Sequence, residues 1–308
     1  METATEFEQH RGHLTGVAYR MLGSLADAED AVQDAWLRLQ RVDRAEIEDL
    51  RGWLTTVTGR LCLDRLRSAR AVREAYVGPW LPEPLVARLP DATAPDPADL
   101  AVQDESIRMA LLVVLERLTP EQRVAFVLHD VFGVPFDGVA DVLGLTPEAA
   151  RQHASRARRA VRDHTPRRSA PVGEQRAVLD AFFTAARKGD LHGLLKLLSP
   201  DVVLTSDGGG LVQAARRPVE GADKVARFII GIIEKARPAE WVAELASVNG
   251  EPGMVAWLRP PGSEDLVLLG VTWIEMAPGG RVEHVQLLIN PEKLTRIDLT
   301  PSAPLEPL

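Results

Sequence analysis

Residues 118–162 read LTPEQRVAFVLHDVFGVPFDGVADVLGLTPEAARQHASRARRAVR, and this stretch contains one helix-start signal twice. Leu-Thr-Pro-Glu occurs at 118–121 and at 145–148, and each copy provides Thr as N-cap, Pro at the first helical position and an acid in the first turn. The run FDGVADVL predicts a short helix that ends at Gly144, directly before the second copy. Two helices joined by a tight turn with glycine predict a helix-turn-helix.

The second helix of this pair, over 147–163, separates small residues from arginines. Ala150, Ala154 and Ala157 recur at the spacing of one helix face, so this face is expected to pack closely on a partner. Arg and Gln side chains on the other face can pair bidentately with base edges in the major groove and can hold phosphates. A solvated basic face is the alternative interpretation. The candidate DNA-reading residues are Arg151, Gln152, Ser155, Arg156 and Arg159.

Two longer helices are predicted upstream. The first runs from Ala28 to Leu39, with apolar residues three and four positions apart. Its outer face is acidic and carries Asp27, Asp30, Gln33 and Asp34. The second covers about 50–74, has leucines at core spacing, and places Cys62 among them as a small buried hydrophobe. Its C-terminal half is basic and exposes Arg60, Arg65, Arg67, Arg70 and Arg73, against the single acid Asp64.

A Pro-rich acidic segment, YVGPWLPEPLVARLPDATAPDPADL, separates these helices from the next ones at 76–100. Its prolines remove backbone donors and favour extended geometry, so regular structure is not expected there. A connection of this length without regular structure is typical of a functional segment or a linker. Trp80 and Leu81 lie among the prolines and are expected to dock on another surface.

The second half of the chain has a different pattern. Residues 1–170 contain 22 Arg and no Lys, whereas residues 171–308 contain all 5 Lys. Two helices are predicted over 174–198, then a strand, a DGGG turn at 207–210, and a helix that begins at Ala222. Four strand-like runs follow after residue 240. Helices followed by a series of strands predict an α+β domain.

Composition restricts the class of protein. The 308 residues are 45% apolar and 26% charged with a net charge of −8, which is ordinary for a globular protein. The lone Cys62 excludes a disulfide framework and a CxxC-type metal site. No apolar run reaches the roughly 18 residues of a membrane helix, and METATEFEQHRGH lacks a signal-peptide core, so a cytoplasmic location is expected. The overall acidity argues against a free-standing DNA-binding protein.

Three blocks in order resemble bacterial sigma factors of the extracytoplasmic-function type. Residues 18–39 (AYRMLGSLADAEDAVQDAWLRL) are similar to the region that docks on the RNA polymerase clamp, and 51–70 (RGWLTTVTGRLCLDRLRSAR) to the region that opens and reads the −10 promoter element. Residues 118–162 are similar to the module that reads the −35 element. The resemblance therefore assigns the acidic face to polymerase binding and the basic half of 50–74 to the −10 element. Many relatives have Arg-Asn where this chain has Gly59-Arg60, so the captured base is left open.

The second half resembles the SnoaL-like domain, a curved sheet wrapped around helices, which one branch of sigma factors carries as a fused domain. WLPEPL (80–85), DGGG (207–210) and NPEKL (290–294) carry this resemblance. It implies regulation of the sigma core in cis, with no cofactor and no metal, and it makes the domain a candidate receptor for a small-molecule ligand. The candidate interdomain residues are Trp80, Leu81, Pro82, Glu83, Pro84, Asp207, Gly208, Gly209, Asn290, Pro291, Lys293 and Leu294.

These patterns predict a multidomain protein with two all-α domains, the second a helix-turn-helix, and an α+β SnoaL-like domain with a cone-shaped barrel. The expected divisions are region 2 at 1–75, a linker at 76–100, region 4 at 101–165, a linker at 166–174 and the SnoaL-like domain at 175–308.

The predicted function is promoter-specific transcription initiation, with core RNA polymerase and promoter DNA as partners, no membrane and no enzymatic activity. One alternative is a ligand-sensing helix-turn-helix regulator that works without polymerase. Another is an isomerase- or cyclase-type enzyme with a pocket lined by Trp241, Trp257, Trp273 and His284.

Overall fold

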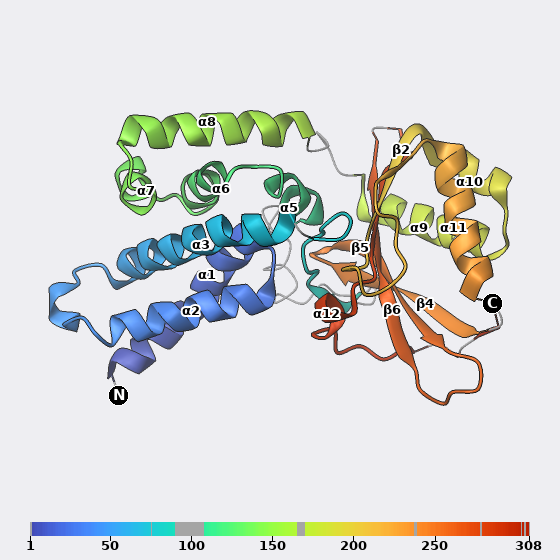
Figure 1. Cartoon of the computed structure of the whole chain (residues 1–308), viewed down its shortest axis with the longest axis horizontal. Helices are drawn as coiled ribbons and strands as arrows, with labels where there is room; N and C mark the ends of the chain where they lie inside the picture. The colour runs from blue at the N-terminus through green and yellow to red at the C-terminus, as the bar shows by residue number, and fades with distance from the viewer. Residues whose placement is uncertain are drawn as a thin grey trace. The chain divides into compact units, whose positions relative to one another are not determined.

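The chain forms two compact units in a computed structural model that describes residues 2–74, 76–89, 108–164, 170–236, 239–277, 279–302, 304 and 306–307. Unit 1 comprises residues 1–75 and 110–165, and unit 2 comprises residues 76–109 and 166–308. Figure 1 shows that the first unit is helical and that the second is built on a sheet. The beginning of the Pro-rich segment thus belongs to the sheet unit, and its part at 90–107 lies outside the described residues.

Three long helices open unit 1 and pack on one another: α1 (Glu2–Leu22), α2 (Leu25–Leu39) and α3 (Leu50–Glu74), with a short 3-10 turn, η1 (Arg44–Glu46), before α3. The Ser24 side chain caps α2, which therefore begins three residues before the predicted start. The apolar face predicted for α2 is buried, and so is Cys62 in α3, as predicted.

The helix-turn-helix lies in the second part of unit 1. The elements are α5 (Met109–Leu115), α6 (Pro120–Phe126), a π-helical segment η3 (Val127–Val131), α7 (Phe136–Leu143) and α8 (Pro147–His164). Thr119 caps α6 in a capping box with Gln122, and Thr146 Oγ1 accepts a hydrogen bond from the Ala149 amide before α8. Gly144 ends α7 with φ +67°. The helix-turn-helix and both start signals are confirmed.

Unit 2 is an eight-stranded sheet with helices α9, α10 and α11 on one face (Figure 1). The strand order is β1-β4-β5-β6-β7-β2-β3, β8 also pairs with β4, and the β2–β7 pair is parallel whereas the other pairs are antiparallel. The strands are β1 (Val86–Arg88), β2 (Leu198–Asp207), β3 (Val219–Glu220), β4 (Glu240–Val248), β5 (Glu251–Arg259), β6 (Val267–Met276), β7 (Val282–Leu288) and β8 (Glu306–Pro307). The helices are α9 (Val172–Arg187), α10 (Leu191–Leu197), α11 (Ala222–Ala236) and α12 (Pro291–Leu294).

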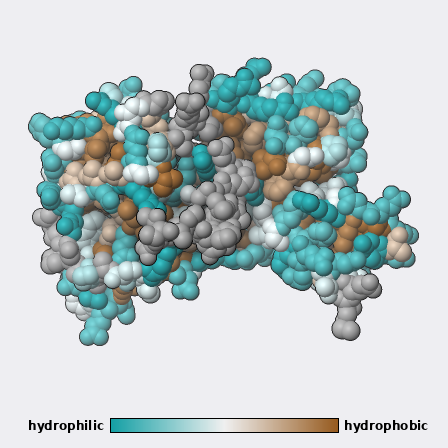
Figure 2. All heavy atoms as spheres, turned by 180° about the vertical axis from the view of Figure 1, so that it is seen from behind, coloured by the Kyte–Doolittle hydropathy of each residue, from teal (hydrophilic) through white to brown (hydrophobic). Residues whose placement is uncertain are grey.

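A core of fully buried apolar side chains joins the helices to the sheet. Leu179 and Phe182 of α9, Val225 of α11, and Leu204 and Val285 of the sheet belong to one cluster. Each such side chain contributes about 1.5–3 kcal/mol relative to an exposed one. On the face shown in Figure 2, hydrophilic residues predominate and hydrophobic ones form scattered patches. The predicted α+β class is confirmed.

Three short strands were not predicted: β1, β3 and β8. Strand β1 forms inside the Pro-rich segment, where no regular structure was expected, and pairs antiparallel with β4 so that Val86 lies opposite Val248. The residues between Pro84 and Pro90 are free of proline and keep their amide donors, which allows a short edge strand to form.

The prediction of a pocket lined by Trp241, Trp257, Trp273 and His284 is wrong. Trp241 lies opposite Leu258 and Trp257 lies opposite Val242 in the β4–β5 register. Since consecutive residues of a strand point to opposite faces, the two indoles lie on different faces of the sheet.

Candidate functional sites

The outward face of α8 is exposed and basic. Its inner face carries Ala150, Ala154 and Ala157, which have no solvent exposure. Arg158 forms an ion pair with Asp130 of η3 at 2.6 Å, so this guanidinium supports the packing of α8. The guanidinium of Arg151 lies 5.3 Å from the centre of the Phe136 ring. All the residues predicted to read DNA lie on the exposed part: Arg151, Gln152, Ser155, Arg156 and Arg159.

Two of the arginines predicted for the −10 element donate to the helix-turn-helix part of unit 1. Arg60 Nη2 donates to the Asp141 carbonyl oxygen at 3.0 Å, at the end of α7. Arg67 Nη2 lies 3.0 Å from Glu121 Oε1 of α6. Asp64 is exposed, and the side chain of Arg70 lies outside the described part of the chain. Helix α3 therefore packs on α6 and α7 with the help of two of the side chains that were assigned to DNA.

Arg65 has a different set of partners from its neighbours. Its guanidinium lies 2.8 Å from Asp34, 3.7 Å from Asp30 and 4.0 Å from Asp27. These three carboxylates form the acidic face of α2 that was predicted to bind polymerase, and Gln33 is exposed beside them. One guanidinium facing three carboxylates leaves this face with a net negative charge.

Asp207 brings the three motifs of unit 2 together. It ends β2, has no solvent exposure, and accepts four hydrogen bonds. Its Oδ1 accepts from the Tyr76 hydroxyl at 2.6 Å and from the Gly209 amide at 3.0 Å. Its Oδ2 accepts from the Leu81 amide and from Lys293 Nζ, both at 2.8 Å. We call this group of residues the Asp207 cluster: Tyr76, Trp80, Leu81, Asp207, Asn290 and Lys293.

Lys293 connects the NPEKL motif to the Pro-rich segment. Its Nζ donates to the Leu81 carbonyl oxygen at 2.6 Å and lies 3.8 Å from the centre of the Trp80 ring. Asn290 caps α12 through the Glu292 amide and donates to the Tyr76 hydroxyl at 3.0 Å. Burial, together with the hydrogen bond to Asp207, raises the pKa of Tyr76 above its ordinary value.

The remaining predicted interdomain residues surround this cluster. Gly209 has φ +65°, and a Cβ there would meet the Asn290 side chain, so the DGGG turn requires glycine at this point. Leu81, Pro82, Pro84, Gly208 and Leu294 are buried, Glu83 is half-buried, and Pro291 is exposed. The structure thus brings the three motifs into one site.

Three contacts of the Pro-rich segment were not found from sequence. The Leu85 amide donates to Asn249 Oδ1, and the Asn249 amide donates to the Leu85 carbonyl oxygen, both at 2.8 Å. Arg88 donates to the Thr300 carbonyl oxygen at 2.9 Å and to Ser302 Oγ near the C-terminus. Tyr76 likewise had no sequence signal. The Asn249-Gly250 turn was the available clue, because Asn at positive φ (+50°) is typical of tight turns.

Among the described residues, no group of three or more His, Cys, Asp and Glu side chains is arranged to hold a metal ion. In that same part of the chain, none of the helices combines the length and the apolar character that a membrane span requires.

Two known families match the two helical parts of unit 1. The family described as Sigma-70 region 2 matches residues 7–72, and the family described as Sigma-70, region 4 matches residues 108–161. The two matched stretches are the α1–α3 helices and the α5–α8 helices. Their order defines the class of RNA polymerase sigma factors.

Relatives that match most of the chain show which group of sigma factors it belongs to. The ECF RNA polymerase sigma factor SigJ of Mycobacterium tuberculosis is 52% identical over 251 residues, which cover 81% of this chain and 79% of SigJ. The probable ECF sigma factor SigI of the same species is 37% identical over 92% of both chains. The crystal structure of SigJ matches 96% of this chain and all of its own, with a TM-score of 0.75 and 45% identity. The chain belongs to the extracytoplasmic-function sigma factors.

Proposed function

We propose that this sigma factor directs promoter-specific initiation through unit 1 and that unit 2 regulates it in cis by binding the connecting segment at 76–88. In this proposal α8 reads the −35 element, α3 acts at the −10 element, and the acidic face of α2 docks on core RNA polymerase. The protein then acts in the cytoplasm, where its polymerase is found.

The Asp207 cluster is the observation that supports regulation through the segment. Leu81 uses both its amide and its carbonyl oxygen in this cluster, and its side chain is buried. A segment held in this way is not available to another partner that needs the same residues. In this proposal polymerase is that partner, so binding of the segment to unit 2 and binding to polymerase are competing states, and the cluster sets the free energy difference between them.

Run-off transcription with purified core polymerase tests this proposal in the full chain. Lys293→Met removes the cation of the cluster, and Lys224→Met, at an exposed position of α11, is the matched control. We expect Lys293→Met to change transcript yield at least about threefold, since about 0.7 kcal/mol of bias has that effect, and we expect the control to leave it unchanged. The direction of the change shows whether the cluster restrains or supports initiation. Equal yields from wild type and Lys293→Met, with unit 2 folded, would refute regulation by the cluster.

We further propose that unit 2 is regulatory and not an enzyme. A general base must be able to reach its substrate proton. Asp207 is the carboxylate of the DGGG motif, but it is buried and already accepts four hydrogen bonds. An assay of isomerase and hydrolase substrates with the full chain checks this proposal, and turnover that Asp207→Asn abolishes would contradict it.

A further inference from the structure

The ring of Phe136 contacts both the segment before the helix-turn-helix and the helix that is predicted to read DNA. Phe136 is the first residue of α7 and is half-buried. His129 of η3 stacks on it, with the ring centres 3.8 Å apart and an angle of 28° between the planes. The guanidinium of Arg151 in α8 lies 5.3 Å from the centre of the same ring. One aromatic side chain thus links η3 to a candidate DNA-reading arginine.

The turn between η3 and α7 holds this ring in place. His129 Nδ1 donates to the Val134 carbonyl oxygen at 2.9 Å, which fixes the imidazole against the turn. The Val134 amide donates to the Leu128 carbonyl oxygen, also at 2.9 Å. Pro135 then sets its own φ directly before Phe136. Because the backbone on both sides of the stack is bonded or restricted, Phe136 offers Arg151 a fixed surface.

Arg151 keeps donors for DNA although it has two partners within unit 1. An aromatic ring has no nitrogen or oxygen acceptor, so the contact with Phe136 uses none of the five N–H donors of the guanidinium. Arg151 Nη1 also lies 3.3 Å from Glu148 Oε1, and the two side chains are 54% and 73% exposed. Exposed ion pairs of this kind are weak, so DNA can replace the carboxylate. The ring remains as the contact that restricts where the guanidinium lies, and a restricted side chain loses less freedom on binding.

Position and charge favour a base edge over a phosphate as the ligand of Arg151. Arg151 lies near the start of α8, and the N-terminal residues of a recognition helix are those that contact base edges. The Glu148 carboxylate beside it repels a phosphate, whereas a base edge carries no net charge. In the major groove only guanine presents two acceptors, O6 and N7, to the two parallel donors of a guanidinium. The ligand that fits this arrangement is therefore a guanine.

We propose that Arg151 reads a guanine of the −35 element and that Phe136, held by His129, positions the guanidinium for this contact. Phe136 is then a positioning residue, which acts on base preference through Arg151. The inference rests on the function proposed above for α8. Since the ring contacts one of the candidate DNA-reading side chains, its loss should alter the preference at one base position and leave the other positions unchanged.

Selection of DNA by the holoenzyme from a promoter library randomised over the −35 element tests this proposal without a known promoter. Sequencing of the bound DNA gives the preference for guanine at each position. We expect Arg151→Gln to lower this preference at one position about 5–150-fold, as the loss of a bidentate contact implies. Phe136→Leu should lower it at the same position about two- to fivefold, the size of an exposed cation–π contact. Phe136→Tyr keeps the aromatic ring and should retain the preference.

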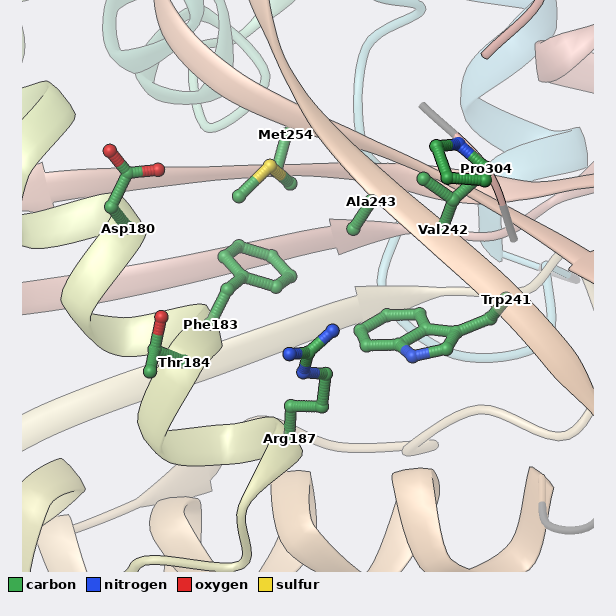
Figure 3. A pocket seen from close by; sticks show the side chains of 9 residues that line it. All are labelled: Asp180, Phe183, Thr184, Arg187, Trp241, Val242, Ala243, Met254 and Pro304. Carbon is green, nitrogen blue, oxygen red and sulfur yellow. The ribbon is translucent and has the colours of Figure 1, made fainter. Parts of the chain in front are cut away.

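Two other phenylalanines provide matched controls. Phe132→Leu alters a half-buried ring of the same unit, which lies 5.1 Å from the guanidinium of Arg20. Phe183→Leu alters a ring that lines a cavity of unit 2 together with Trp241 and Met254 (Figure 3). Neither control should change the guanine preference at the position that Arg151→Gln identifies.

The outcomes separate this inference from the proposed function. Selection of no −35 sequence by the wild type would contradict the function proposed for α8. A selected sequence that Arg151→Gln leaves unchanged would overturn the reading of guanine by Arg151. Equal weakening on all sequences in Phe136→Leu, or a further loss when it is added to Arg151→Gln, would overturn the positioning role. Phe136→Met replaces Phe136→Leu in the same comparison if thermal unfolding shows that the leucine variant does not fold.

Discussion

At the scale of residues, Asp207 and Lys293 form a buried ion pair in which each group depends on the other. Lys293→Met leaves a carboxylate without solvent exposure and without its cation, and breaking such a pair costs about 3–5 kcal/mol. Native-state hydrogen exchange of the Leu81 amide measures the free energy of local opening at the cluster. We expect Lys293→Met to lower this free energy by about 3–5 kcal/mol. The double variant Asp207→Asn/Lys293→Met removes both charges and should recover part of the loss. A loss below about 1 kcal/mol in Lys293→Met would show that water replaces the lysine.

Tyr76 makes the stability of the Asp207 cluster depend on pH. Its pKa in the folded protein is raised by burial and by the hydrogen bond to Asp207, so the neutral phenol is favoured in the fold. The contribution of Tyr76 to stability is therefore fully present below the unfolded pKa of about 10 and is lost as the pH rises above it. We expect the difference in unfolding free energy between wild type and Tyr76→Phe to shrink between about pH 9 and pH 11.5. A constant difference over that range would mean that folding does not raise the pKa of Tyr76.

Cys62 is the single cysteine of the chain and is fully buried in α3. Burial raises its pKa to about 12, so almost no thiolate exists at neutral pH. We expect 5,5′-dithiobis(2-nitrobenzoate) to leave the native protein unmodified at pH 8 and to modify one thiol after denaturation. Rapid modification of the native protein would show that α3 opens readily from its neighbours.

At the scale of elements, α8 contains two neighbouring arginines with different roles. Arg156 is exposed, whereas Arg158 pairs with Asp130 of η3 at 2.6 Å. We expect Arg156→Ala to weaken holoenzyme binding to −35 DNA by about 1–3 kcal/mol if the side chain reaches a base edge. Arg158→Ala should instead lower the thermal stability of unit 1 with a smaller effect on base preference. Fluorescence anisotropy with matched and mutated −35 sequences separates the two effects, and equal loss of preference in both variants would contradict this division.

Elements with a local signal could be predicted, and elements made by distant pairing could not. The two Leu-Thr-Pro-Glu signals specify the starts of α6 and α8 because Thr and Pro act within one turn. Strand β1 has no such signal, since its pairing with β4 depends on residues more than 150 positions away. The motifs that contain Asp207 and Lys293 were identified by resemblance. That they meet at one buried carboxylate could not be predicted, because it depends on how the fold places Leu81, Asn290 and β2 beside one another.

At the scale of the whole molecule, the compactness of unit 1 conflicts with the spacing of the promoter elements. Elements named −10 and −35 lie about 25 base pairs apart, or about 85 Å along B-form DNA. A compact body of about 130 residues has a radius of gyration of only about 14 Å. If α3 and α8 bind these two elements as proposed, they cannot reach both while α3 packs on α6 and α7. The proposal therefore requires this packing to open during initiation. The pairing of Arg60 with the Asp141 carbonyl oxygen is one contact that opening must break.

Gly59 provides the means to test this opening. A Cβ at position 59 would lie 3.3 Å from side-chain atoms of Leu128 and Val142, so the glycine lets α3 approach α7 closely. The same proximity makes Gly59→Cys/Val142→Cys a candidate for a disulfide between the two helices. Because Cys62 is buried with a raised pKa, it does not compete for oxidation.

We expect the oxidised double variant to bind core polymerase poorly or to give at least about tenfold less promoter transcript, which corresponds to about 1.4 kcal/mol. Dithiothreitol should restore activity to the level of the reduced protein. The single variants Gly59→Cys and Val142→Cys control for the substitutions and should not respond to oxidation. Full transcription by the crosslinked protein would mean that promoter recognition proceeds with α3 and α7 still in contact, and that the two DNA elements are not bound at the same time.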